Sequence, residues 1–139
     1  MIKTVTRSKE ISVVVMNEVG ALARTMSFLV NHGINVLTIA GYSNNDGNQG
    51  ELIFITENNE SAINELINNG YGDIREGEVL VVELENRPGT LKNVSELLAV
   101  NNININYIYC TTCSCGCPAK IVLATSDNDR AYDILSPAQ

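Results

Sequence analysis

Two short segments of the sequence carry residue types that could hold a small polar molecule. They are Asn17–Leu22 and Asn86–Leu91, and each has an asparagine three residues before a glycine and five before a leucine. Another asparagine, Asn35 or Asn104, comes 18 residues after the first one. Each segment follows an apolar run and opens a helical pattern, and the first N–H groups of a helix favour a carboxylate. Asparagine side chains can accept from an ammonium group, so the pattern indicates a site for a zwitterion. The alternative is a tight strand-to-helix turn without a ligand.

A cysteine cluster is the second candidate for chemistry. All four cysteines lie close together, at Cys110, Cys113, Cys115 and Cys117. Four thiolates could ligate Zn²⁺ or an iron–sulfur cluster. However, alternate residues of a strand point to opposite faces, so all four converge only if the hairpin tip is irregular. Redox-active thiols with a local disulfide, and free thiols without a function, therefore stay open as alternatives.

The chain contains an internal repeat. A shift of 69 residues aligns the two halves without a gap from residue 11 to about residue 66, and it places Gly20 on Gly89. Apolar residues fall on apolar residues at nearly every position that would face a core. The sequence therefore predicts a duplicated structural unit.

Periodicity predicts the elements of each unit. In the first copy we expect strands at 10–16, 34–42, 51–57 and 71–75, and helices at 20–32 and 61–69. In the second copy we expect strands at 78–85, 103–112 and 119–126, and helices at 89–101 and 129–135. This order is β-α-β-β-α-β, which is typical of the α+β ferredoxin-like fold with antiparallel sheets and both helices on one face.

The second copy lacks a counterpart of the strand at 71–75. We therefore predict a complete first domain over 1–77 and a second domain over 78–139 that is truncated after its second helix. The extension 1–7 has no counterpart in the repeat, and it contains Ile2 and Val5. Because an unpaired sheet edge is usually covered, we expect this extension or a neighbouring chain to lie on it.

Composition excludes several classes of protein. A net charge of -7 argues against nucleic-acid binding, which requires a basic face. The sequence has no apolar run long enough to span a bilayer and no signal peptide, so we expect a cytoplasmic protein. It has one histidine, which rules out two-histidine chemistry within one chain.

The two turns resemble those of the ACT domain family of small-molecule sensors. The matching features are the Asn-x-x-Gly-x-Leu turns, the Gly-Ile-Asn-Val and Asn-Ile-Asn-Ile segments after the first helix of each copy, and the order of elements. The resemblance covers about residues 8 to 139 and implies a tandem ACT protein that binds an amino acid. It implies one site at Asn17, Gly20, Ala21, Leu22 and Asn35, and another at Asn86, Arg87, Gly89, Thr90, Leu91 and Asn104. In that family a site is often formed by the turn of one domain and the second strand of its partner.

The leading hypothesis is therefore a regulatory module, not an enzyme, that acts through a homodimer or a partner metabolic enzyme. The first alternative is a metal- or redox-responsive module that uses the cysteine cluster. The second is a small acylphosphatase-like hydrolase, for which Arg87 lacks a convincing partner acid, base or nucleophile. If only one turn binds a ligand, we expect it to be Asn86–Leu91.

Overall fold

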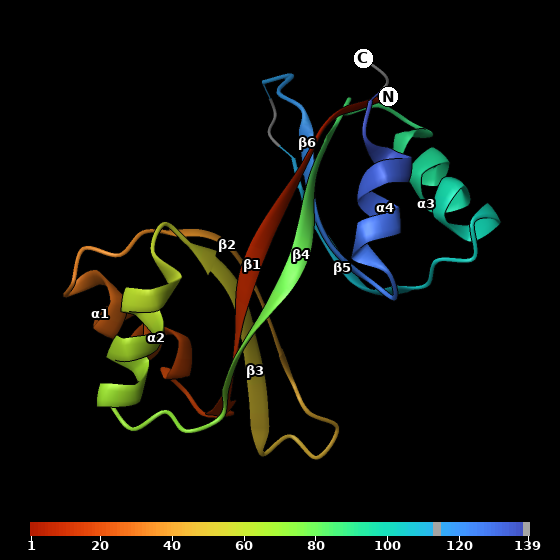
Figure 1. The fold of residues 1–139 in the computed structure, drawn as a ribbon. Coiled ribbons are helices and arrows are strands. Elements are labelled where there is room, and N and C mark those ends of the chain that lie inside the picture. The colour runs from red at the N-terminus through yellow and green to blue at the C-terminus, as the bar shows by residue number, and fades with distance from the viewer. Residues whose placement is uncertain (113–114, 138–139) are drawn as a thin grey trace. The chain divides into compact units, whose positions relative to one another are not determined.

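A computed structural model describes residues 1–112 and 115–137 of the chain (Figure 1). Within them the order of elements is the predicted one, and the α+β assignment is confirmed. The strands are β1 (Ile2–Met16), β2 (Val36–Ser43), β3 (Gln49–Thr56), β4 (Ile74–Leu84), β5 (Ile105–Thr111) and β6 (Ala119–Thr125). The helices are α1 (Ala21–Val30), α2 (Asn59–Asn68), α3 (Thr90–Val100) and α4 (Asn128–Leu135).

The chain forms two compact units. One is Lys9–Gly77, and the other combines Met1–Ser8 with Glu78–Gln139. The long strands β1 and β4 contribute one stretch to each unit. The sequence assigns residues 1–77 to one domain, whereas the contacts group the first eight residues with the second copy.

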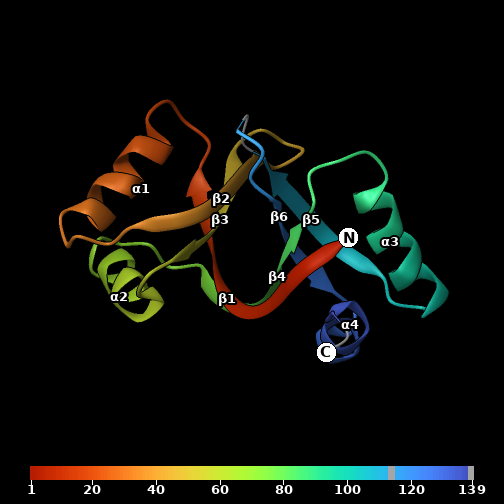
Figure 2. The same cartoon turned by 90° about the horizontal axis from the view of Figure 1, so that it is seen from above.

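The unit Lys9–Gly77 has the strand order β2-β3-β1, with the start of β4 beside β1. Pairing of β1 with β3 is antiparallel and sets Ile11 opposite Phe54. The two helices lie side by side on one face of this sheet in both views (Figures 1 and 2). The residues buried between sheet and helices are Ile11, Val13, Leu29, Ile34, Leu52, Phe54, Ala62 and Leu66. These residues alternate along β1 and β3 and recur at helical spacing on α2. The apolar residues of the sequence have the same two periods.

The second unit has the order β4-β6-β5, with Met1–Ser8 of β1 on the outer side of β4. Its core contains Leu80, Val82, Leu84, Val94, Leu98, Ile103, Ala119, Ile121, Leu123, Ala131 and Leu135. Ile2 and Val5 pack against this core, and the Glu85 N–H donates to the Met1 carbonyl at 3.0 Å. Within the described residues no strand follows α4. The N-terminal segment thus occupies the edge that the repeat leaves open.

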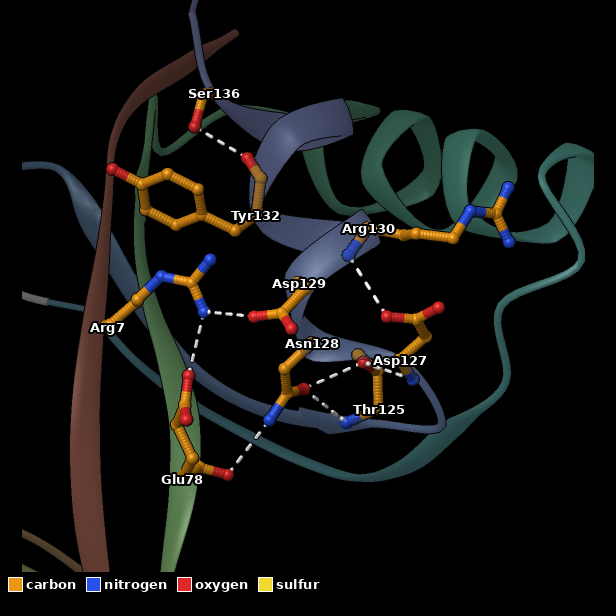
Figure 3. Close-up of polar contacts among 9 residues, drawn as sticks. All are labelled: Arg7, Glu78, Thr125, Asp127, Asn128, Asp129, Arg130, Tyr132 and Ser136. Atoms are coloured by element: carbon orange, nitrogen blue, oxygen red, sulfur yellow. Dashed lines mark hydrogen bonds and ion pairs between the residues drawn. The ribbon is translucent and has the colours of Figure 1, made fainter.

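Arg7 ties this segment to α4 and β4 (Figure 3). Its Nη1 lies 2.6 Å from Asp129 Oδ1 and 2.8 Å from Glu78 Oε1, and its guanidinium carbon lies 4.5 Å from the centre of the Tyr132 ring. The two carboxylates raise the pKa of Arg7. Single exposed ion pairs contribute little to stability, but this arginine bridges two acids and an aromatic ring at once.

An asparagine clamp recurs at the start of the second helix of each unit. Asn59 Oδ1 accepts from the Thr56 N–H at 3.1 Å and the Thr56 hydroxyl at 2.8 Å, and its Nδ2 donates to the Lys9 carbonyl at 2.8 Å. Asn128 repeats this with Thr125 at 3.0 and 2.7 Å and with the Glu78 carbonyl at 2.9 Å (Figure 3). Each clamp joins a strand end, a helix start and the neighbouring strand.

Two strands are longer than predicted. The expected strands 71–75 and 78–85 are one strand, β4, and β1 begins at Ile2 instead of residue 10. The added stretches are Ile2–Lys9 in β1 and the two residues Glu76 and Gly77 in β4, and they are mostly polar, so they lack the apolar alternation that predicts a strand. Backbone pairing does not require apolar side chains, and this is why periodicity missed them.

The clamp predicts a stability loss on removal of its amide. We expect Asn128→Ala and Asn59→Ala each to lower the free energy of unfolding by about 1–2 kcal/mol, because each loses several hydrogen bonds. Asn93→Ala, on the exposed surface of α3, is the matched control and should change it by less than about 0.5 kcal/mol. Urea denaturation measures the free energy of unfolding of all three variants. Equal losses in the clamp and control variants would show that the clamp does not stabilise the protein.

The N-terminal segment that covers the edge of β4 predicts a difference in stability between two further variants. Val5→Asp places a carboxylate against the core of the second unit, and we expect it to lower the unfolding free energy by about 2 kcal/mol. Thr4→Asp introduces the same charge at the adjacent exposed position and should be nearly neutral. Hydrogen exchange of the Glu85 amide should accelerate in the Val5 variant alone; equal exchange in both variants would show that Val5 does not hold the edge.

Candidate ligand site at the first strand-to-helix turn

The first turn is built by a glycine and pinned by an asparagine. Gly20 has φ +87°, a left-handed conformation that favours glycine, and α1 begins at the next residue. Asn17 Nδ2 donates to the Gly47 carbonyl at 2.9 Å, and the Asn17 N–H donates to the Asn48 carbonyl at 3.0 Å. Asn17 thus holds the turn against the β2–β3 hairpin.

A hollow of about 600 Å³ opens at this turn. Four predicted site residues line it together, namely Asn17, Gly20, Ala21 and Leu22. The other walls include Val15 and Met16 of β1, Tyr42 and Ser43 of β2, and Glu51 and Leu52 of β3. The hollow is therefore mostly apolar, with a helix N-terminus at one side and a carboxylate at another.

Glu51 is the half-buried carboxylate of this hollow, beside the exposed Glu18, and the sequence analysis did not select it. Its Oε2 accepts from the Tyr42 hydroxyl at 2.8 Å, and its other oxygen accepts from the Ser12 hydroxyl. The hydrogen bond to Glu51, together with burial and the negative charge, raises the pKa of Tyr42. Tyr42 and Glu51 flank the predicted hairpin at facing positions, so hairpin pairing was the signal that could have found them.

Asn35 does not join this turn. It follows α1, whose ten residues carry the chain about 15 Å along the helix axis. Its Nδ2 contacts Glu57 Oε1 at 3.4 Å, and its carbonyl accepts from the Glu57 N–H at 3.1 Å. Asn35 therefore lies at the other end of the unit from Asn17.

The second turn has the same backbone but different side-chain contacts. Gly89 has φ +93°, and the Thr90 hydroxyl lies 2.8 Å from the Glu85 carbonyl and 2.6 Å from that of Arg87. Arg87 pairs with Glu85 at 2.9 Å. Thr90 is buried, and its hydroxyl is used in hydrogen bonds to the backbone of the turn. Asn86 and Leu91 are exposed, whereas Asn104 lies after α3 and bonds Asn106 at 3.2 Å.

The cysteine cluster is described in part, because Cys113 lies outside the described residues. Cys110 and Cys115 are exposed and lie outside any disulfide, and partial burial of its thiol raises the pKa of Cys110. Cys117 is disulfide-bonded, and its Sγ lies 4.0 Å from Cys115 Sγ. A sulfur in a disulfide is not a thiolate ligand, so binding of Zn²⁺ or an iron–sulfur cluster would require its reduction.

No group of three or more metal-binding side chains occurs among the described residues. The metal assignment stays a prediction.

In the part of the chain that the structure describes, no helix is long and apolar enough to cross a membrane. A duplicated ferredoxin-like unit with a hollow at its first strand-to-helix turn defines a structural class.

Comparison with known proteins makes this class specific. Residues 80–136 match the family model of the acetohydroxyacid synthase (AHAS) small subunit-like ACT domain. No curated protein gives a significant match to the sequence. This match lies in the second copy and supports the resemblance to the ACT domain family. A match to an ACT domain also agrees with the prediction that the chain is not an enzyme.

Solved structures support the fold over nearly the whole chain. Protein BT0572 from Bacteroides thetaiotaomicron superposes with a TM-score of 0.85 at 23% identity, covering 94% of this chain and 88% of that one. The regulatory subunit of aspartate kinase from Thermus flavus gives a TM-score of 0.70 at 16% identity, covering 96% and 94%. The ligand-free subunit from Thermus thermophilus gives 0.69 at 13%, covering 96% and 95%. The chain is thus similar in fold to these three proteins.

The Tyr42–Glu51 contact predicts a pH effect. The raised pKa means that the contact stabilises the protein below the ordinary pKa of tyrosine, about 10, and is lost as pH rises through the folded value. We expect Glu51→Gln to lower the pKa of Tyr42 toward the ordinary value. Tyrosine Cζ resonances followed by NMR against pH measure this, with Glu57→Gln as the control. An unchanged Tyr42 titration in Glu51→Gln would contradict the contact.

Proposed function

We propose that this protein is an ACT regulatory module that binds an amino acid with an apolar side chain at its first turn. One observation carries the proposal: the helix-opening turn Asn17–Leu22 lines a hollow of about 600 Å³ together with apolar residues and a single half-buried carboxylate, Glu51.

The proposal assigns each part of a zwitterion to a matching part of the hollow. The ligand carboxylate lies at the N-terminus of α1, where the first N–H groups and the helix dipole favour an anion. Its ammonium lies near Glu51 and Tyr42. Its side chain packs against Val15, Leu22 and Leu52, and this apolar lining is what favours an apolar amino acid.

The proposal also assigns a role to Asn35 and Asn104, which lie away from the turn of their own units. Exposed apolar residues occur on both outer strands, at Leu37 and Ile39 of β2 and at Tyr107 and Ile108 of β5. Pairing of one of these strands with an ACT unit of a second copy would bring an asparagine to the turn of that unit. We therefore propose a homodimer in which turn and second strand come from different units.

Binding would act by changing the geometry of this dimer or of a complex with a metabolic enzyme. The fold similarity to regulatory subunits of aspartate kinase supports a partner enzyme as the target, without identifying it. Because metabolic enzymes are the proposed targets, we place the protein in the cytoplasm.

Thermal denaturation with each of the twenty amino acids tests the proposal. We expect one or more apolar amino acids to raise the melting temperature, because a ligand that binds only the folded state stabilises it. Asn17→Ala and Glu51→Gln should each weaken the binding measured by calorimetry about tenfold, since Asn17 holds the turn at the helix N-terminus and Glu51 faces the ligand ammonium. Asn64→Ala, exposed on α2, is the control, and Asn86→Ala reports on the second turn.

A redox response is the second candidate, and the disulfide of Cys117 beside the Cys115 thiol favours it. The same melting series with a reductant and with a chelator separates the two candidates. If no amino acid changes the melting temperature while reductant or chelator does, the amino acid proposal is wrong and the cysteine hairpin is the sensor.

A further inference from the structure

The unit Lys9–Gly77 contains a second hollow, of about 270 Å³, beside α1. It is lined by β1 at Val14 and Val15, by the side of α1 that carries Arg24 and Phe28, and by the loop Asn69–Gly72 that leads from α2 to β4. The first hollow instead meets α1 at Leu22 and Ala23. The two hollows therefore lie on different sides of the first turns of α1.

Gly70 and Gly72 belong to the loop wall of this second hollow. Tyr71 stands between them and fixes the loop to α1: its hydroxyl lies 2.8 Å from the Thr25 hydroxyl, and its ring meets Phe28 edge-on at 6.0 Å. The hollow thus combines an aromatic wall with a hydroxyl pair.

Arg24 is the cation of this hollow. Its Nη2 pairs with Glu18 Oε1 at 2.7 Å, and both side chains are about half exposed, at 51% and 53%. An exposed pair of this kind contributes little to stability, so an incoming carboxylate can replace Glu18 at small cost. A guanidinium binds a carboxylate through two parallel hydrogen bonds, which makes Arg24 well suited to an acidic ligand.

We propose that this hollow is a second ligand site, for a small carboxylate with a flat apolar body. The carboxylate pairs with Arg24, and the apolar body lies against Phe28, Tyr71 and Val14. The volume suits a ligand of the size of benzoate and is at the small end of ligand pockets.

Glu18 couples this site to the first hollow, because it lines both. A carboxylate on Arg24 releases Glu18, whose charge then becomes available to the ammonium group of a ligand in the first hollow. This coupling rests on the proposed amino acid site, whereas binding at Arg24 does not. Two ligands that favour the same side-chain arrangement bind with positive cooperativity.

Benzoate is the probe for the site, followed by ¹⁵N–¹H NMR at millimolar concentrations in the full chain. We expect amide shifts confined to residues 14–28 and 69–72, and none with benzyl alcohol, which has the same ring without the charge. Arg24→Gln should weaken benzoate binding about tenfold. Arg75→Gln, an exposed arginine outside this hollow, should leave it unchanged.

Glu18→Gln should change the affinity for benzoate in the direction opposite to Arg24→Gln. It frees Arg24 from its partner, so benzoate binding should tighten severalfold, a result that a purely structural Glu18–Arg24 pair would not produce. Equal binding in wild type and Arg24→Gln, equal shifts with benzyl alcohol, or shifts elsewhere in the chain would each overturn the site. Thermal melting of each variant confirms that it is folded.

The coupling is measured separately, by repeating the amino acid melting series with benzoate at saturation. Stronger amino acid binding in wild type and no such gain in Glu18→Gln is the expected result. If benzoate binds at Arg24 while no amino acid binds at all, the proposed function fails and the second site stands. If both bind without affecting each other, the coupling through Glu18 is wrong.

Discussion

The backbone edge of β4 is the constraint on which the second unit depends. Its repeat supplies α3, β5, β6 and α4 but, within the described residues, no strand to follow α4. An open edge next to a buried core would leave peptide groups without partners. Met1–Ser8 covers this edge with its backbone, with Ile2 and Val5, and with the Arg7 bridge to Glu78 and Asp129. The strand β1 therefore contributes residues to both units.

Duplication has kept the backbone of the turn and changed what surrounds it. Gly20 and Gly89 adopt the same left-handed conformation before a helix. Around the first, small and apolar residues leave a hollow that Glu51 borders; around the second, the Thr90 hydroxyl bonds back to the turn. This favours the first turn as the ligand site, whereas the sequence alone had favoured the second because of Arg87 and its neighbours.

Most of the fold could be predicted because apolar periodicity is a local property. It placed all four helices and most of the strands within a few residues, and the shift of 69 identified the repeat. It failed at Ile2–Lys9 and at Glu76 and Gly77, which belong to strands although most of their residues are not apolar. It also missed the asparagine clamps, although Thr56 with Asn59 recurs as Thr125 with Asn128 at the same shift.

The sequence by itself determined the duplicated α+β fold and the backbone of the two turns, because glycine, asparagine and apolar spacing act over short stretches of chain. Only the tertiary structure decided which residues share a site. It brought Glu51 and Tyr42 to the first turn and left Asn35 at the far end of α1, since strand pairing and helix length fix those distances. It also placed Arg24 and Tyr71, 47 residues apart in sequence, in one hollow. Proximity between distant segments is a product of packing, and local pattern does not encode it.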